Sequence, residues 1–325
     1  MKAETPQQAA PGWMVWAALW TVYIVWGSTY LAIRITVETL PPLMTGGVRF
    51  VIAGVLMAVF LRLKRGSGGI RVSARELGAA AFVGTALLVG GNGLVMIAEQ
   101  YVPSGVASLL IATVPLWVIL FRSLTGDRVA LGTLFGVIMG FAGVAVLVLP
   151  SGDGGGQAPL GGMLLLILAA FFWAGGTFSS RRVSLPSDPF TSTAAQMVTG
   201  GAISLLAGVA RGEASGIDPA TFSARSMWAV LYLIFVGSLF AFTAYVWLLQ
   251  HAPVSKVATY AYVNPVIAVF LGWLVLSEEL TASVIVGAAV IVSSVAFIVR
   301  KESAPARADS EELAPSAVTA DAHSV

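Results

Sequence analysis

Two stretches of the chain, WGSTYLAIRITVETLPPLMTGGVRFVIAG at residues 26–54 and WAGGTFSSRRVSLPSDPFTSTAAQMVTGG at residues 173–201, align over their full length without a gap. The alignment superposes Trp26 on Trp173, and it also pairs an arginine and a proline of each stretch. Such an internal match indicates that the chain contains two copies of one structural unit.

The two copies also match farther along the chain. YVPSGVASLLIATVPLWVILFRSL at residues 101–124 overlies HAPVSKVATYAYVNPVIAVFLGWL at residues 251–274, and Pro115 meets Pro265. The duplication therefore extends over most of the apolar part of the chain.

The composition is that of a membrane protein. Of the 325 residues, 57% are hydrophobic and only 10% are charged, whereas an ordinary soluble domain has about 25% charged residues. A soluble protein of this size could not cover so much apolar surface, so we expect its exterior to face lipid. Cysteine is absent, and the two histidines are His251 and His323. Disulfides and thiolate chemistry are thus excluded, and we expect no metal site.

A membrane-spanning helix needs about 20 mostly apolar residues, and the chain contains ten such stretches. They are residues 13–33, 43–63, 77–98, 104–124, 129–149, 160–180, 190–210, 227–249, 254–276 and 283–299. Each copy holds five of them, and because five is odd, the second copy enters the membrane from the opposite side. The predicted fold is therefore an all-α integral membrane protein with ten transmembrane helices in two inverted five-helix repeats.

This count divides the chain into five regions. They are a cytoplasmic N-terminal tail (1–12), the first repeat (13–149), an external glycine-rich linker (150–159), the second repeat (160–300) and a disordered cytoplasmic tail (301–325). The linker and the tail lack the apolar content needed to fold alone.

The basic residues predict the orientation, because cytoplasmic loops carry an excess of Lys and Arg. With both termini on one side, only Arg34, Arg211 and Arg225 fall on the other side, and Arg49 lies within a helix. We therefore predict cytoplasmic N- and C-termini in a bacterial inner membrane.

Four motifs carry a family resemblance: WGSTYLAIR (26–34), LPPLMTGGVRF (40–50), GNGLVMIAEQYVPSGVASLLIATVPLW (91–117) and TYAYVNPVIAVFLG (259–272). They resemble the EamA-type carriers of the drug/metabolite transporter superfamily, and among them the YedA-like bacterial inner-membrane exporters. One departure is LSEELT at 276–281, where Ser277 stands at a position that is often glycine in relatives.

The resemblance implies a secondary transporter that works by alternating access around a central cavity between the repeats. It implies export of small organic solutes such as amino acids, other metabolites or amphiphilic drugs. The alternatives are a lipid or amphiphile flippase of the same fold, a static helix bundle and a membrane-embedded enzyme. An enzyme is not expected, because no HExxH motif and no Ser-His-Asp set occurs in the helices, and the absence of GxxxxGK[ST] argues against an ATP-driven pump. As partners we expect the lipid bilayer and a small-molecule substrate, with no nucleic acid and no cofactor.

Polar and aromatic side chains at depth in the membrane are the candidates for the substrate cavity, because an unpaired polar group there costs about 2–7 kcal/mol. Each side chain either contacts substrate or packs within the protein, and the sequence leaves both readings open. The candidates are Trp26, Tyr30, Asn92, Trp117, Trp173, Gln196, Tyr260, Tyr262 and Asn264.

Pro115 and Pro265 are hinge candidates, since each lies near the middle of a predicted helix and removes a backbone hydrogen bond. Arg49 and Glu99 are candidates for a buried ion pair, because a charge within the membrane needs a partner. Binding of a substrate carboxylate by Arg49 is the alternative, and proton coupling through Glu99 is another.

Gly132, Gly136 and Gly140 recur every fourth residue, a spacing that permits close helix packing. We expect internal packing there, with a homodimer interface as the alternative.

Overall fold

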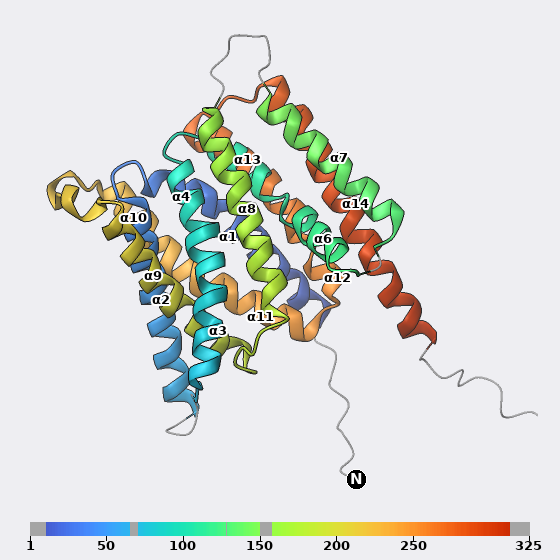
Figure 1. The fold of residues 1–325 in the computed structure, drawn as a ribbon. Coiled ribbons are helices and arrows are strands. Elements are labelled where there is room, and N and C mark those ends of the chain that lie inside the picture. Colours follow the sequence, from blue (N-terminus) through green and yellow to red (C-terminus); the bar gives the residue numbers. More distant parts are fainter. Residues whose placement is uncertain (1–10, 66–70, 128, 150–157, 313–325) are drawn as a thin grey trace, which may run out of the picture.

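The computed structural model describes residues 11–65, 71–127, 129–149 and 158–312, and these residues form helices and connecting loops with no strands (Figure 1). The helices of the first repeat are α1 (Gly12–Thr36), α2 (Pro42–Arg65), α3 (Ala74–Gly84), η1 (Thr85–Gly93), α4 (Leu94–Ala98), α5 (Ser104–Ile111), α6 (Val114–Leu124) and α7 (Leu131–Val148). The predicted all-α fold is confirmed.

The second repeat follows the same order. Its helices are α8 (Leu160–Ser180), α9 (Pro189–Ala210), η2 (Glu213–Gly216), η3 (Pro219–Thr221), α10 (Ala224–Tyr232), η4 (Leu233–Phe240), α11 (Ala241–His251), α12 (Val254–Val257), α13 (Tyr260–Leu276) and α14 (Ala282–Glu312). Most of the linker predicted at 150–159 and most of the two terminal tails lie outside the described residues.

Nine helical stretches among the described residues are long and apolar enough to cross a membrane. They correspond to the predicted spans except the ninth, and some join several labelled helices, such as Ala74–Ala98 in the third span and Ala224–His251 in the eighth. The predicted ninth span (254–276) is instead divided into α12 and α13, of which Tyr260–Leu276 is apolar but shorter. The described part of the chain thus has nine spans of sufficient length and a tenth, Tyr260–Leu276, that is shorter.

The two proline-containing spans are interrupted in different ways. In the fourth span the α-helix breaks at Ala112 and Thr113, and Pro115 lies in the first turn of α6. In the ninth span the break comes before Tyr260, whereas Pro265 lies inside α13. A proline fits the first turn of a helix, where its missing N–H has no partner in any case, so Pro115 begins a helix and Pro265 weakens one.

The third and eighth spans each contain a π-helical segment, η1 and η4, at equivalent places in the two repeats. A π-helix, in which each backbone hydrogen bond spans five residues, is rare and is often found at functional sites. Both segments are therefore candidate parts of a functional site.

Helix pairs from different repeats hold the protein together. Helix α2 packs along α9, and α7 packs along α14, and Figure 1 shows α7 and α14 side by side at one edge. In the second pair, Ser294 Oγ donates a hydrogen bond to the Gly136 carbonyl at 2.5 Å. The predicted glycine face of α7 is thus used for packing within the chain, and the homodimer remains a prediction.

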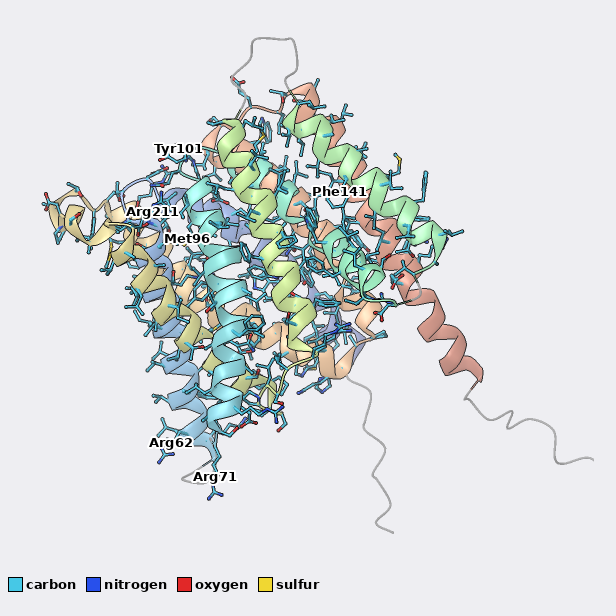
Figure 2. All side chains as sticks on the ribbon, in the orientation of Figure 1. Arg62, Arg71, Met96, Tyr101, Phe141 and Arg211 are labelled. Carbon is cyan, nitrogen blue, oxygen red and sulfur yellow. The ribbon has the colours of Figure 1, made fainter. Side chains whose placement is uncertain are left out.

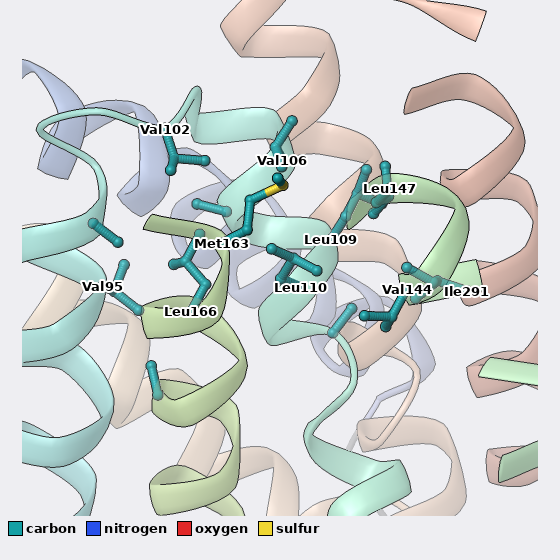
Figure 3. Close-up of a cluster of buried hydrophobic side chains, with 14 of the residues drawn as sticks. Val95, Val102, Val106, Leu109, Leu110, Val144, Leu147, Met163, Leu166 and Ile291 are labelled. Carbon is teal, nitrogen blue, oxygen red and sulfur yellow. The ribbon is translucent and has the colours of Figure 1, made fainter. Parts of the chain in front are cut away.

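A large cluster of buried apolar side chains lies between these helix pairs. Figure 3 shows part of it, where Leu109 and Leu110 of α5 meet Leu166 of α8 and Val144 of α7. The exterior of the spans is apolar too: Leu63 is 80% exposed and Phe135 is 61% exposed. An apolar exterior of this kind suits a protein that is surrounded by lipid.

The aromatic residues of α1 do not form one face. Trp13, Trp16 and Trp20 are exposed on the outside, whereas Tyr23 and Trp26 turn inward. A step of three residues rotates 300° around a helix, so these aromatic residues, spaced mostly by three, turn gradually around α1. Of these, only Tyr23 and Trp26, which turn inward, can contribute to a site inside the protein.

The C-terminal helix is longer than predicted. Helix α14 continues past residue 300 to Glu312, into the segment that we predicted to be disordered. Its last part contains three Ala and three Glu between residues 301 and 312, and both residue types have high helix propensity.

Candidate functional site

The structure brings two predicted cavity residues into one group, which we call the central cluster: Trp26, Arg49, Ser238, Tyr245 and Tyr260. The ring of Trp26 lies 5.0 Å from that of Tyr245 and 5.2 Å from that of Tyr260, and the two tyrosine rings are 5.8 Å apart. These three residues come from α1, α11 and α13, so the group joins the first helix to the second repeat.

The π-helix η4 connects the aromatic and the charged part of the central cluster. Trp26 Nε1 donates a hydrogen bond to the Gly237 carbonyl at 3.3 Å, and Arg49 Nε donates one to the neighbouring Ser238 Oγ at 3.0 Å. The Gly237 carbonyl of η4 thus accepts a hydrogen bond from a side chain of α1. A glycine and a serine inside an apolar run are the sequence signal for this segment, yet neither the segment nor Tyr245 was predicted.

A second group of predicted residues lies in the other half of the protein. Trp117 packs with its ring 4.9 Å from that of Phe141 and 5.4 Å from that of Phe171. Trp173 lies directly against Gly91, beside Asn92 in the π-helix η1. The Asn92 Oδ1 and Trp117 Nε1 atoms are buried and have no hydrogen-bond partner among the described residues.

The other predicted cavity residues have individual surroundings. Tyr30 lies one turn after Trp26 in α1. Gln196 Nε2 donates to Ser192 Oγ of its own helix at 2.9 Å, and Tyr262 packs against the large apolar cluster. Neither Gln196 nor Tyr262 belongs to the central cluster.

Asn264 precedes Pro265 in α13 and is 8% exposed. Its backbone carbonyl lies close to Gly27 of α1, and its side-chain Oδ1 has no partner within the described part of the chain. The helix interruption thus places another unsatisfied polar group beside α1.

The predicted ion pair between Arg49 and Glu99 does not form. Nη1 of Arg49 and both carboxylate oxygens of Glu99 are buried and lack hydrogen-bond partners among the residues described. Arg49 turns toward η4, whereas Glu99 follows α4. The sequence places both residues at a similar depth in the membrane. It does not determine how each helix is rotated about its axis, and this rotation decides which way each side chain points.

Glu99 lies at the end of the third span, close to two other charged residues. Arg34 Nη1 donates to the backbone carbonyl of Glu99 and leaves the carboxylate without a partner. The Glu278 carboxylate instead accepts hydrogen bonds from Ser104 N at 2.7 Å and Gly105 N at 2.9 Å. Glu278 therefore caps the start of α5, while Glu99, which is fully buried, has no such support.

The aromatic rings of the central cluster pack against one another. Two hollows lie away from the central cluster, one beside residues 277–281 and one between Ser293 and Lys301. Within the central cluster, Arg49 and Ser238 are buried, whereas Trp26, Tyr245 and Tyr260 are half-buried.

Broken spans in both repeats, π-helices at equivalent positions and unsatisfied polar groups deep between the spans define a class of multi-pass membrane transport protein. The chain belongs to the EamA-like transporter family, whose model matches it twice, over residues 12–149 and 160–300. It is accordingly a multi-pass inner-membrane transporter of this family.

The relatives of this chain are also named as transporters. The chain is 40% identical over 259 residues to the uncharacterized inner membrane transporter YedA of Escherichia coli strain K12, covering 79% of this chain and 81% of YedA. It is 29% identical to the uncharacterized transporter YvbV of Bacillus subtilis, covering 86% of this chain and 90% of YvbV. A solved crystal structure shares the fold with a TM-score of 0.59 and 22% identity, over 89% of this chain and 98% of the other.

Proposed function

We propose that the protein is a secondary carrier that exports small organic solutes by alternating access between its two five-helix repeats. The observation that carries this proposal is the set of unsatisfied polar atoms deep between the spans. They are Arg49 Nη1, Asn92 Oδ1, Trp117 Nε1 and Asn264 Oδ1. Each would cost about 1–3 kcal/mol in a static bundle, whereas a carrier offers such groups to its solute.

Movement of the repeats is supported by the places where the helices are weakest. The breaks before Pro115 and Tyr260 and the π-helices η1 and η4 interrupt regular hydrogen bonding in four spans. Interrupted helices in matching positions of two repeats are typical of transporter sites. A rocking motion about these segments opens the packed central cluster first to one side and then to the other.

The orientation is inferred from the charges. Arg62 and Arg71 lie at one end of the protein, and Tyr101 lies at the opposite end (Figure 2). Because cytoplasmic loops are rich in Lys and Arg, the end with Arg62 and Arg71 faces the cytoplasm, and Glu99 lies toward the outside. In the proposed export, solute moves from the end with Arg62 and Arg71 to the end with Tyr101.

Counterflow into proteoliposomes is the experiment that tests the proposed function. Purified protein is reconstituted, loaded with one unlabelled solute at a time from a panel of amino acids, metabolites and amphiphilic drugs, and assayed for uptake of the labelled solute. We expect at least one solute to enter with saturation and to be competed by its analogues, since a carrier exchanges solutes through one site.

Protein-free vesicles and a parallel assay of labelled-lipid movement serve as controls. Silence across the panel, together with movement of labelled lipid between leaflets, would identify a flippase and contradict the proposal.

A further inference from the structure

Arg49 is a buried charge in the first repeat, and its guanidinium Cζ lies over the Phe50 ring at 4.6 Å from the ring centre. It lies seven residues into α2, and a rise of about 1.5 Å per residue puts it roughly 10 Å below the end of the span. The side chain is 5% exposed, its Nε donates to Ser238 Oγ at 3.0 Å, and its Nη1 has no partner among the described residues. One neutral hydroxyl group is therefore the hydrogen-bonding partner that the structure shows for this guanidinium.

The described acidic groups that form ion pairs are elsewhere. Arg122 pairs with Asp127 at 3.3 Å and with Glu302 at 2.5 Å, and Arg225 lies 3.8 Å from Glu38. A cation inside a membrane span is costly unless an anion joins it, and such residues mark substrate or ion pathways. Since the described part of the chain does not place an acid on Arg49, the missing anion is one that enters and leaves.

The surroundings of Arg49 are suited to a particular kind of anion. The adjacent Gly237 carbonyl is bonded to Trp26, whose ring packs with those of Tyr245 and Tyr260. Aromatic faces bind flat or apolar bodies, and a guanidinium binds the planar fork of a carboxylate through two N–H groups. Charge and aromatic surface thus meet at one place in the membrane.

The equivalent position in the second repeat has a different residue. Gln196 stands there, and its side chain is bonded to Ser192 in the same helix. Only one of the two repeats therefore carries the charge, so one anionic group is bound per chain.

We propose that the substrates are organic carboxylates with an aromatic or apolar body, whose carboxylate is bound by Arg49 while the body lies against Trp26, Tyr245 and Tyr260. This inference rests on the proposed carrier function and adds the class of substrate. Arg49 is a specificity-determining residue, because it selects the charged form of a solute over a neutral form of the same shape.

The test compares pairs of solutes that differ in charge but hardly in shape, such as N-acetylphenylalanine and its amide, and N-acetylleucine and its amide. Exchange is measured in proteoliposomes, and binding is measured by the shift in melting temperature of the detergent-solubilised protein. We expect the wild type to prefer the acids over the amides by about tenfold or more, the size of a hydrogen bond to a charged group.

Arg49→Gln should remove this preference, whereas Arg49→Lys should keep part of it. The glutamine variant is expected to fold, because it gives the first repeat the residue already present at the equivalent position of the second. Arg211→Gln, which removes an exposed arginine, is the matched control and should leave the preference unchanged.

Two outcomes would overturn the inference. One is equal exchange and binding of acids and amides by the wild type, and the other is an acid preference that persists in Arg49→Gln. If no solute exchanges but the acids alone shift the melting temperature through Arg49, the site stands and the carrier function fails.

Discussion

The Gly47→Leu substitution is expected to prevent the protein from folding. A Cβ atom at Gly47 would lie 2.6 Å from Leu205 Cγ, and 2.8 Å from both the Gly201 carbonyl oxygen and the Leu205 backbone nitrogen. Backbone atoms cannot turn aside, so any side chain at this position forces α2 and α9 apart. Overpacking by a small group already costs about 1–3 kcal/mol, and leucine adds four carbon atoms at this contact.

The measurement is the yield of monodisperse protein after detergent extraction, together with its melting temperature. Gly78→Leu is the matched control, because Gly78 also lies in a helix but a Cβ there meets no atom within 4 Å. We expect Gly47→Leu to be lost as aggregate, Gly47→Ala to be folded but less stable, and Gly78→Leu to behave as the wild type. A wild-type melting temperature for Gly47→Leu would show that the contact between α2 and α9 is wrong.

The stability of the wild-type protein is expected to fall as the pH rises, and Glu99 is the cause. Glu99 directly follows the third span, which ends at Ala98. Burial raises the pKa of the Glu99 carboxyl well above its ordinary value, the nearby Glu278 carboxylate raises it further, and Arg34 opposes both effects. There is therefore a pH range in which the Glu99 carboxyl is mostly neutral in the folded protein but ionised in the unfolded chain.

The sign of the effect follows from proton binding. Between the unfolded and the folded pKa of Glu99 the folded protein holds one more proton, so its stability falls by about 1.4 kcal/mol for each pH unit. The loss begins near the ordinary glutamate pKa of about 4.3 and ends at the folded pKa. Glu99→Gln resembles the neutral form, and this variant should lose most of the dependence.

The expectation is tested by measuring the melting temperatures of both proteins at several values between about pH 5 and about pH 9. Glu279→Gln is the control, since Glu279 is exposed on the neighbouring turn and its removal should leave the wild-type slope. Equal slopes for the wild type and for Glu99→Gln would mean that Glu99 is ionised in the folded state.

The sequence predicted the spans because hydrophobic length alone decides whether a helix can cross a membrane. The same reasoning did not find the break before Tyr260, since neither Ala258 nor Thr259, where the helix stops, is a glycine or a proline that would mark a break. Ser277 is a clearer case: it adopts a φ of 54°, a left-handed conformation that glycine adopts most easily. A glycine would adopt this backbone conformation at a lower cost than the serine does.

Only part of the central cluster could be predicted. Trp26 and Tyr260 were predicted because aromatic residues at depth in the membrane are candidates for a substrate cavity. Ser238 and Tyr245 were not predicted, because their position in the cluster depends on the π-helix η4. The charged residues show the same limit. Charge and depth suggested that Arg49 and Glu99 would pair, whereas the rotation of each helix, which tertiary packing sets, keeps them apart.

Two-sided access to the central cluster tests the central claim most directly. The chain has no cysteine, so Thr29→Cys places a single thiol where Thr29 packs against Gly237. Membrane-impermeant maleimide is applied from one side at a time to oriented vesicles, with Tyr101→Cys and Arg62→Cys as single-cysteine controls for the outer and inner ends. We predict that the thiol at position 29 reacts from either side and that a transported solute protects it. Reaction from one side only, with both controls labelled as expected, would contradict alternating access.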